Sequence, residues 1–575
     1  MLKLIKFLSP YKGQVTAMLI LLFLQVLGTL YIPTLTADIV NNGIVAGDLN
    51  HIWKTGGFML AVAVSIVGVS LAGTYLSTSI FSRMGRDIRN ALFEKSQLLT
   101  IDQFNHFGPA SMITRSTNDI MQIQMAYMAG TEMILPAPVM TIAGLVLAFS
   151  KSPSLAMVIV IAMLIVCIFA FFLTQKVMPL FSKQQTLLDK INRTLREMLT
   201  GIRVIRAFNR SGSEQERTDK SFANYAQSAI RINKIFAVMM PVIMLIMNIC
   251  TVIILANGGQ QVADGAMKIG DIMALTEYAI MILMYLIMGI MVFMVFPRAQ
   301  SCANRVNEVL AVNTDTAVNQ QKPRQHQAKA KLEFRDVTFQ YKGAEEPVLN
   351  NISFTADIGK TTAIIGGTGS GKSTIANLIP RFYDIQSGTI RIDGVNILRM
   401  PRQALRDKIG FVPQKAFLFS GTILDNFRHG KKDATMEEIR HAAQIAQIDD
   451  FIDGLEDGYD TRVAQGGNNF SGGQKQRLAI ARALVKKPEI YIFDDSFSAL
   501  DFKTDAKLRA ALKKETTGSA VILVAQRIST IMDADQIVVL DEGRIAGIGT
   551  HKELMQSCTV YQQIAHSQLN EEELA

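Results

Sequence analysis

Long hydrophobic runs without Asp, Glu, Lys or Arg occupy the first half of the chain. A charge at the middle of a bilayer costs about 2.5 kcal/mol or more on insertion scales, and a helix needs about 20 apolar residues to cross the hydrocarbon. Charge-free runs near or above this length predict six membrane spans: Gly13 to Ala37, Thr55 to Ser82, Met133 to Ser150, Ser152 to Gln175, Ile235 to Ala263 and Tyr278 to Pro297.

The pattern changes after Arg298, where short apolar runs alternate with stretches of helical periodicity. The segment Asn313 to Lys331 has almost no large apolar residue, which is typical of a linker. The predicted organisation is a helical membrane domain in residues 1–310, a linker in residues 311–331 and a separate α/β domain in residues 332–575.

Basic residues are concentrated in alternate loops between the predicted spans. The N-terminal segment has three lysines, and the loops before the third and fifth spans have five and twelve Lys or Arg residues, whereas each remaining loop has one. Because basic loops stay in the cytoplasm, both termini are predicted to be cytoplasmic, in a bacterial plasma membrane. The two long basic loops are predicted to be helices that continue from the spans.

The overall composition agrees with a membrane protein, with 49% hydrophobic and only 19% charged residues. This excludes a wholly soluble chain. The net charge of +9 follows from the basic loops, so it does not require nucleic acid as a partner. The four cysteines lie far apart and lack CxxC spacing, which argues against a zinc or disulfide framework.

Gly366 to Thr374 (GGTGSGKST) matches the phosphate-binding loop GxxxxGK[ST], with an apolar strand before it and a helical stretch after it. The glycines let backbone N–H groups surround phosphate oxygens, and the helix N-terminus adds positive potential. Lys372 would neutralise the β- and γ-phosphates, and the Ser373 hydroxyl would ligate Mg²⁺. The second domain is therefore predicted to be an α/β P-loop nucleotide-binding domain.

Two further segments suit the same chemistry. Ile490 to Asp495 (IYIFDD) is an apolar strand that ends in two carboxylates, as needed to hold Mg²⁺ or its water. Phe470 to Arg477 (FSGGQKQR) places a glycine pair before a helix-forming run, which suits anion binding at a helix start. Taken alone, the first segment could be an ordinary buried strand that ends in Asp, and the second could be an ordinary turn.

The order and spacing of these motifs resemble an ABC transporter nucleotide-binding domain, and the six spans resemble half of an ABC exporter. In that family Tyr341 would stack on adenine, Gln414 would sense Mg²⁺ and γ-phosphate, and Ser498 to Asp501 would form the D-loop. The signature Ser471 to Gln474 would contact ATP held by the opposite domain, so a dimer is implied.

The resemblance thus implies ATP and Mg²⁺ as cofactors and assigns the following residues. Nucleotide contacts are Tyr341, Gly366, Thr368, Gly369, Ser370, Gly371, Lys372, Ser373, Thr374, Gln414, Ser471, Gly472, Gly473, Gln474, Asp494 and Asp501; metal contacts are Ser373, Gln414 and Asp494; catalytic residues are Asp495, Gln526, Gln414, Ser471 and Gly473. In the cytoplasmic loops, Thr114 to Asp119 and Gly201 to Phe208 resemble the coupling segments that dock on the nucleotide-binding domains; the alternative is a solvated helix face.

Two positions depart from the family pattern. Asp495 stands where active members usually have a Glu as general base, and Gln526 replaces the switch His. Asp is one methylene shorter than Glu, so its carboxylate is misplaced as a general base for the attacking water. Gln keeps hydrogen bonding but, unlike His, cannot become cationic. The chain therefore resembles the degenerate-site subunit of a heterodimeric multidrug exporter, whose signature completes the partner's competent site. A homodimer with two slow sites is the alternative.

Polar residues in the spans are candidates for substrate contacts: Gln25, Asp38, Glu132, Asn248 and Glu277. Glu132 would attract cationic amphiphiles, while Asp38 and Glu277 also suit an interfacial position. Methionines at helical spacing in the sixth span suit either an adaptable pocket or lipid-facing packing: Met281, Met284, Met288, Met291 and Met294. Pro136, Pro138 and Pro241 are expected to kink their helices.

The predicted function is ATP-driven export of hydrophobic or cationic drugs across the plasma membrane. The alternatives are a lipid or peptide exporter, or a regulatory ATP-binding subunit that transports nothing itself. The predicted partners are a second exporter half with a consensus site, the lipid bilayer and hydrophobic or cationic small molecules.

Overall fold

The computed structural model describes residues 1–293, 296–312 and 331–568, and the chain divides into two compact units. The helical unit comprises Met1–Leu98 and Gly108–Val312. The α/β unit comprises Leu99–Phe107 and Asn313–Ala575. Most of the predicted linker, residues 313–330, lies outside the described residues.

Among the described residues, six helical stretches are long and apolar enough to cross a membrane: Leu2–Ile44, Leu49–Leu98, Pro109–Lys151, Pro153–Thr200, Ser211–Ala263 and Ile269–Ile290. They confirm the six spans predicted from the sequence. The unit contains α1 (Lys12–Asp38), α2 (Leu49–Leu98), α4 (Pro109–Thr114), α5 (Ile120–Ala129), α6 (Pro136–Lys151), α7 (Pro153–Thr200), α8 (Ile202–Ala207), α9 (Ser211–Ala263), α10 (Ile269–Phe293) and α11 (Phe296–Leu310), with a 3₁₀ segment η1 (Leu2–Tyr11) and π-helical turns η2 (Ile39–Ile44), η3 (Arg115–Asp119) and η4 (Gly130–Ile134).

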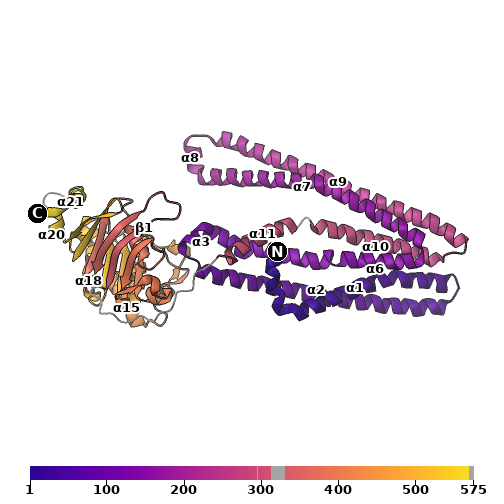
Figure 1. Ribbon diagram of the computed structural model, residues 1–575, viewed down its shortest axis with the longest axis horizontal. Coiled ribbons are helices and arrows are strands. Elements are labelled where there is room, and N and C mark those ends of the chain that lie inside the picture. Colours follow the sequence, from indigo (N-terminus) through magenta and orange to yellow (C-terminus); the bar gives the residue numbers. More distant parts are fainter. Residues whose placement is uncertain (294–295, 313–330, 569–575) are drawn as a thin grey trace. The chain divides into compact units, whose positions relative to one another are not determined.

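The helices pair along their lengths (Figure 1). Helix α1 packs against α2, α7 packs against α9, and α10 packs against α6, α1 and α9. The short helix α8 joins α7 to α9 at their tip, as the figure shows. Helices of about 50 residues are much longer than a bilayer requires, which confirms that the spans continue beyond the membrane, as the basic loops predicted.

Prolines in the spans have unequal effects on the backbone. Before Pro136 the chain forms the π-helical turn η4, in which Leu135 N–H donates to the Gly130 carbonyl at 3.0 Å. By contrast, α9 continues through Pro241 from Ser211 to Ala263. The expected irregularity in the third span is therefore present before Pro136.

The α/β unit is built on a six-stranded sheet in the order β12-β11-β3-β10-β9-β6, beside a four-stranded sheet β2-β1-β4-β5 and a two-stranded pair β7-β8. The strands are β1 (Leu332–Phe339), β2 (Leu349–Ala356), β3 (Thr361–Gly366), β4 (Ser387–Ile392), β5 (Val395–Asn396), β6 (Ile409–Val412), β7 (Gly421–Thr422), β8 (Arg462–Val463), β9 (Ile490–Asp494), β10 (Ala520–Val524), β11 (Gln536–Asp541) and β12 (Arg544–Gly549). The helices are α3 (Ile101–Phe107), α12 (Lys372–Leu378), α13 (Arg402–Asp407), α14 (Ile423–Arg428), α15 (Met436–Ile445), α16 (Asp449–Asp453), α17 (Gly472–Val485), α18 (Phe502–Glu515), α19 (Ile528–Ile531), α20 (His551–Ser557) and α21 (Thr559–His566), with 3₁₀ turns η5 (Ile397–Arg399), η6 (Gly458–Asp460) and η7 (Gln465–Gly467).

The large sheet is covered on both faces, which explains why its strands are nearly continuous hydrophobic runs. On β3, Ile364 belongs to a core that also contains α12 and the four-stranded sheet. Its neighbours Ala363 and Ile365 point to the opposite face, into a core with α14, α15 and α17. The strand is thereby held rigidly up to Gly366, where the phosphate-binding loop begins.

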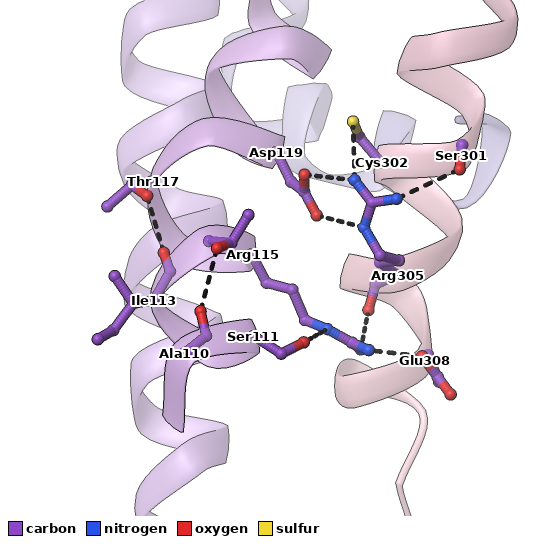
Figure 2. A network of polar contacts seen from close by, with 11 residues as sticks. Ala110, Ser111, Ile113, Arg115, Thr117, Asp119, Ser301, Cys302, Arg305 and Glu308 are labelled. Atoms are coloured by element: carbon purple, nitrogen blue, oxygen red, sulfur yellow. Dashed lines mark hydrogen bonds and ion pairs between the residues drawn. The ribbon is translucent and has the colours of Figure 1, made fainter. Parts of the chain in front are cut away.

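One of the two predicted coupling segments is held by ion pairs within the helical unit. The turn η3 belongs to the helical unit and is bound to α11 (Figure 2). Asp119 accepts hydrogen bonds of 2.6 and 2.8 Å from Arg305, and Arg115 donates to Glu308 at 2.9 Å. The segment Leu99–Phe107 groups with the α/β unit. Docking of Thr114 to Asp119 on the nucleotide-binding domain stays a prediction.

Candidate functional site: a nucleotide site at the carboxyl ends of four strands

The predicted nucleotide residues follow four neighbouring parallel strands of the large sheet. β3, β10, β9 and β6 are adjacent and parallel. Because the carboxyl ends of parallel strands meet at one edge, the loops after these strands lie together. This edge brings together the phosphate-binding loop after β3, Gln526 after β10, Asp494 and Asp495 on and after β9, and Gln414 after β6.

The phosphate-binding loop runs from the end of β3 to the start of α12, as the motif requires. Gly369 and Gly371 have φ angles of 85° and 96°, which favour glycine. A Cβ atom on Gly366 would lie only 2.2 Å from the Leu540 carbonyl oxygen. Nζ of Lys372 donates to the carbonyls of Gly366 and Gly367 at 2.9 and 2.6 Å. Glycine is therefore required for the backbone path of the loop.

The group expected to bind a metal consists of a hydroxyl and a carboxylate. Ser373 Oγ donates to Asp494 Oδ1 at 2.9 Å, and Asp494 is only 4% exposed. Mg²⁺ prefers oxygen ligands of this kind and is usually held by one or two of them together with phosphate oxygens. Burial raises the pKa of Asp494, and burial also lowers the pKa of the nearby Lys372 ammonium. A divalent cation fits this donor set, since it would stabilise the ionised carboxylate.

Asp495 is held by two side-chain amides. Its Oδ2 accepts a hydrogen bond of 2.9 Å from Gln526 Nε2 and one of 3.2 Å from Gln414 Nε2. Ser498 donates to the Asp495 carbonyl at 3.0 Å. The backbone of Asp495 has a φ angle of 48°, a left-handed conformation that is concentrated at functional sites in non-glycine residues. The carboxylate is thus fixed in orientation by residues from three strands.

The pKa of Asp495 is raised, chiefly because burial disfavours the charged form. The hydrogen bond from Gln414 acts in the opposite direction, because it stabilises the carboxylate. The sequence identified Gln414, Asp495 and Gln526 as site residues. It did not predict that both amides donate to the same oxygen, Asp495 Oδ2. It also did not predict that the Ser498 hydroxyl donates to the Asp495 carbonyl.

Tyr341, the predicted adenine partner, lies beside a cavity of about 450 Å³ in the α/β unit. Its hydroxyl is 3.1 Å from Thr374 Oγ1, in the helix after the phosphate-binding loop. Its ring packs edge-on against Phe339 and Tyr383, with centroids 4.8 and 5.3 Å away. The hydrogen bond and the two aromatic contacts orient an aromatic ring next to the start of α12.

The signature residues form the start of α17. Ser471 Oγ accepts from Gln474 N–H at 3.3 Å, and Gln474 Oε1 accepts from Ser471 N–H at 2.8 Å, which is a capping box. Gly473 leaves little room for a side chain, because a Cβ atom there would lie 3.2 Å from the Ala499 carbonyl. Asp501 caps α18 with a single hydrogen bond, accepting from Thr504 N–H at 2.9 Å.

Among the polar residues predicted in the spans, Gln25 and Glu132 line one cavity of about 140 Å³ in the helical unit. Asp38 instead binds Asn42 and His51 at 2.7 and 2.9 Å, so it has local partners at the end of its span. Asn248 and Glu277 do not line the cavity. In the methionine series, Met284 and Met288 are exposed on the isolated chain, and Met294 lies outside the described residues.

Comparison with known proteins agrees with both units. Residues 15–292 match the ABC transporter transmembrane region, and residues 349–498 match the ABC transporter family. An uncharacterized ABC transporter ATP-binding protein of Mycobacterium tuberculosis is 38% identical over 567 residues, which cover 98% of this chain and 97% of that protein. A putative multidrug export ATP-binding/permease protein of Bacillus subtilis is 30% identical over 563 residues, which cover 96% of this chain and 96% of that protein.

Two further similarities concern a lipid-related transporter and a solved structure. A fatty acid ABC transporter ATP-binding/permease protein of Mycobacterium bovis is 31% identical, over 84% of this chain and 76% of that protein. A bacterial Atm1-family ABC exporter with ATP bound has a TM-score of 0.82 at 26% identity, covering 97% of this chain and 99% of that one.

The chain therefore belongs to the ABC transporter family and is an exporter-type half-transporter. It is a multi-pass membrane protein in which an ATPase domain is fused to its transmembrane helices. ATP is the nucleotide of this domain, and its hydrolysis is coupled to transport.

Proposed function

We propose that this chain is one half of a heterodimeric exporter and contributes a degenerate ATP site. The observation that carries the proposal is the hydrogen bonding of Asp495, whose Oδ2 is occupied by the amides of both Gln414 and Gln526. A general base needs a free lone pair aimed at the attacking water. A carboxylate that is one methylene short is held farther from the attacking water, and the two amides that bind Oδ2 leave only Oδ1 to accept the proton, so Asp495 is a poorly placed base for that step.

In this proposal residues 1–310 form the transmembrane domain and residues 332–575 form the nucleotide-binding domain. Lys372 and the backbone N–H groups from Gly366 to Ser373 hold the phosphates, and Tyr341 stacks on adenine. Ser373, Gln414 and Asp494 hold Mg²⁺, which when bound neutralises charge on the phosphate oxygens. The hydrogen bond between Ser373 and Asp494 supports this assignment, because it already places two hard oxygen ligands together.

The signature of this chain acts in the partner's site. Ser471, Gly472, Gly473 and Gln474 contact the γ-phosphate of ATP held by the partner, whose consensus Glu and His carry out rapid hydrolysis. The exposed N-terminus of α17, which is preorganised by its capping box, supports this role. The two halves thus share two unequal sites, and binding of ATP at both closes the dimer.

The transported molecules are hydrophobic or cationic amphiphiles, exported across the plasma membrane from a cytoplasmic side that holds both termini. The basic loops support this orientation. A carboxylate among the lining residues of the cavity in the helical unit supports a cationic substrate. A relative is a putative multidrug exporter, which supports the same class. A lipid-like acid is the second candidate, because another relative is a fatty acid transporter.

Steady-state ATP hydrolysis in lipid tests the proposal. The purified chain is compared with the same chain co-purified with a second exporter half that carries Glu and His at the two positions. We expect slow turnover by the chain alone and fast turnover, stimulated by a cationic dye, with the partner. Full activity of the chain alone would contradict the degenerate site and favour a homodimer.

A further inference from the structure

A cavity of about 140 Å³ lies in the helical unit where residues of α1, α2, η4, α6 and α10 meet. Gln25 comes from α1, Ser77 from α2, Glu132 from the π-helical turn η4, and Tyr285 from α10. Pockets that hold whole drug-sized molecules are about 300–1,000 Å³. This cavity is smaller, so its size suits several waters or the head group of a larger molecule.

The polar groups of the cavity are rich in hydrogen-bond acceptors. The lining contains one carboxylate, that of Glu132, and no Lys, Arg or His. Thr131 Oγ1 donates to the carbonyls of Tyr127 and Met128 at 3.2 and 2.9 Å, so its own proton is used and its oxygen remains an acceptor. Ser77 Oγ is 3.4 Å from both Thr131 Oγ1 and Glu132 Oε1 and has a single proton to share between them. Gln25, Thr74 and Tyr285 in the lining can both donate and accept, so the feature that selects a ligand is the single charged group, the Glu132 carboxylate, which favours a cation.

Glu132 differs from Asp271 and Asp38, which have charged or ionisable partners, and from Glu277, which does not line this cavity. Asp271 pairs with Lys151 at 2.7 Å, and Asp38 binds the His51 ring at 2.9 Å. In the part of the chain that the structure describes, Glu132 has the Ser77 hydroxyl but no ion pair. Glu132 is exposed on the single chain, so a ligand can reach its carboxylate. An ionised carboxylate in a membrane-spanning segment is costly without a counter-charge, and a bound cation would supply one.

The backbone around Glu132 is also irregular. The turn η4 forms an i to i−5 hydrogen bond from Leu135 to Gly130, directly before Pro136, which itself lines the cavity. Single π-helical turns inside helices are frequent at functional sites. This turn supplies both Thr131 and Glu132 to the cavity, so one local distortion places the acceptor and the carboxylate together.

We propose that this cavity binds the protonated amine head group of a cationic amphiphile, with Glu132 as its counter-ion. The proposal rests on the function proposed above, and it adds the head-group chemistry and the place. The ammonium donates to the Glu132 carboxylate and to Thr131 Oγ1 and lies near the Tyr285 ring, where a cation is also favoured. The apolar body extends along Met18, Leu22 and Val26 of α1. A zwitterionic lipid head also carries an ammonium, but its phosphate would find no basic partner in the lining.

Direct binding to the purified full chain tests the proposal, without ATP and without a partner. The chain is placed in nanodiscs of phosphatidylcholine and phosphatidylglycerol, and saturable binding of radiolabelled dodecylamine is measured against empty nanodiscs. Unlabelled dodecylamine, dodecyltrimethylammonium and dodecanol serve as competitors. We expect dodecylamine to compete at least tenfold better than dodecanol, with dodecyltrimethylammonium between them because it lacks N–H donors.

The variant Glu132→Gln keeps the size of the side chain and removes its charge. We expect it to weaken dodecylamine binding at least tenfold and to leave competition by dodecanol unchanged. The matched control is Glu277→Gln on α10, a carboxylate outside the cavity, which should bind dodecylamine like the wild type. Ser77→Ala provides a second variant with an expected smaller loss, should Glu132→Gln fold poorly.

Equal affinity of Glu132→Gln and wild type, equal loss in both glutamine variants, or no saturable binding by the wild type would overturn the subsite. Phosphatidylethanolamine added to the nanodiscs separates the two sources of ammonium. Competition by this lipid that depends on Glu132 would keep the subsite and identify a lipid head group as its occupant. Because the assay needs neither ATP nor a partner, intact binding without dye-stimulated turnover would contradict the proposed function alone.

Discussion

The side-chain amide of Gln526 donates a 2.9 Å hydrogen bond to Asp495 Oδ2, the oxygen that also accepts from Gln414. Both residues of the 2.9 Å pair are positions where the sequence was predicted to depart from the family pattern, and the structure places these two positions in direct contact. A cationic His and a longer Glu in the same two places would present different atoms to the γ-phosphate. The substitutions are therefore best considered together.

Replacing Asp495 by Asn should have little effect on the heterodimer. If the site is already slow, Asp495→Asn should leave at least about half of steady-state ATP hydrolysis by the complex, since the partner's base carries most of the turnover. ATP hydrolysis and ATP binding are measured on the same preparation. Near-total loss of hydrolysis with binding preserved would show that Asp495 is an efficient base.

Ser471→Ala should be far more damaging, because this hydroxyl is proposed to act in the partner's competent site. We expect turnover of the complex to fall about 10- to 100-fold, as when a donor to a transition-state oxygen is removed. Thr435→Ala is a matched control, since Thr435 also forms a capping box, at the start of α15, and is not a signature residue. Unchanged turnover in Ser471→Ala would argue against a shared site.

Restoring both consensus residues should activate the chain alone. The double variant Asp495→Glu with Gln526→His should hydrolyse ATP about tenfold faster or more, because the added methylene moves the carboxylate toward the water and the His can carry charge. Each single variant should do less than the double, since the two side chains touch. Turnover no higher than that of the wild type would indicate that these positions do not limit the site.

Burial of Asp495 has a consequence for stability. Its pKa is raised in the folded protein, so its ionised form destabilises the fold above the raised pKa, and this penalty disappears as the pH falls through it. Asp495→Asn should therefore raise the unfolding temperature at neutral pH, and the difference should shrink in acid. The control is Asp425, whose pKa is lowered by hydrogen bonds from Thr422. Its contribution is present at neutral pH and is lost in acid, so Asp425→Asn should lower the unfolding temperature. If Asp495→Asn and Asp425→Asn changed the unfolding temperature at neutral pH in the same direction, the opposite pKa shifts of the two carboxyl groups would be contradicted.

The ion pair between Asp119 and Arg305 should be a strong contact in the helical unit, because the Asp119 side chain is fully buried. Arg305→Ala leaves that carboxylate without its two charge-assisted hydrogen bonds, which should cost about 1–3 kcal/mol. Thermal unfolding of the full chain is compared with Arg217→Ala, where the pair with Glu197 is half exposed on both sides and should contribute little. A double-mutant cycle with Asp119→Ala isolates the coupling. Additive effects would show that the pair does not contribute.

The sequence alone determined the features that depend on local chemistry. Charge-free runs identify spans because a bilayer excludes charges wherever they occur, and the phosphate-binding loop is recognisable because its glycines and Lys372 are contiguous. The departures at Asp495 and Gln526 were visible for the same reason. Each of these features can be recognised from residues that are neighbours in the sequence.

Tertiary structure decided which residues that are distant in sequence bind the same atom, form an ion pair or line the same cavity. Gln414, Asp495 and Gln526 meet because their strands are adjacent and parallel, and Asp119 reaches Arg305 across 186 positions of the chain. The cavity around Glu132 likewise forms only when α1, α2, η4, α6 and α10 pack together. Periodicity shows that a helix or strand exists but does not specify its neighbours, because many pairings bury the same apolar surface. The segment Thr114 to Asp119 is an example: its charges suited a solvated or docking face, and only the packing of α11 showed that Arg115 and Asp119 are paired inside the helical unit.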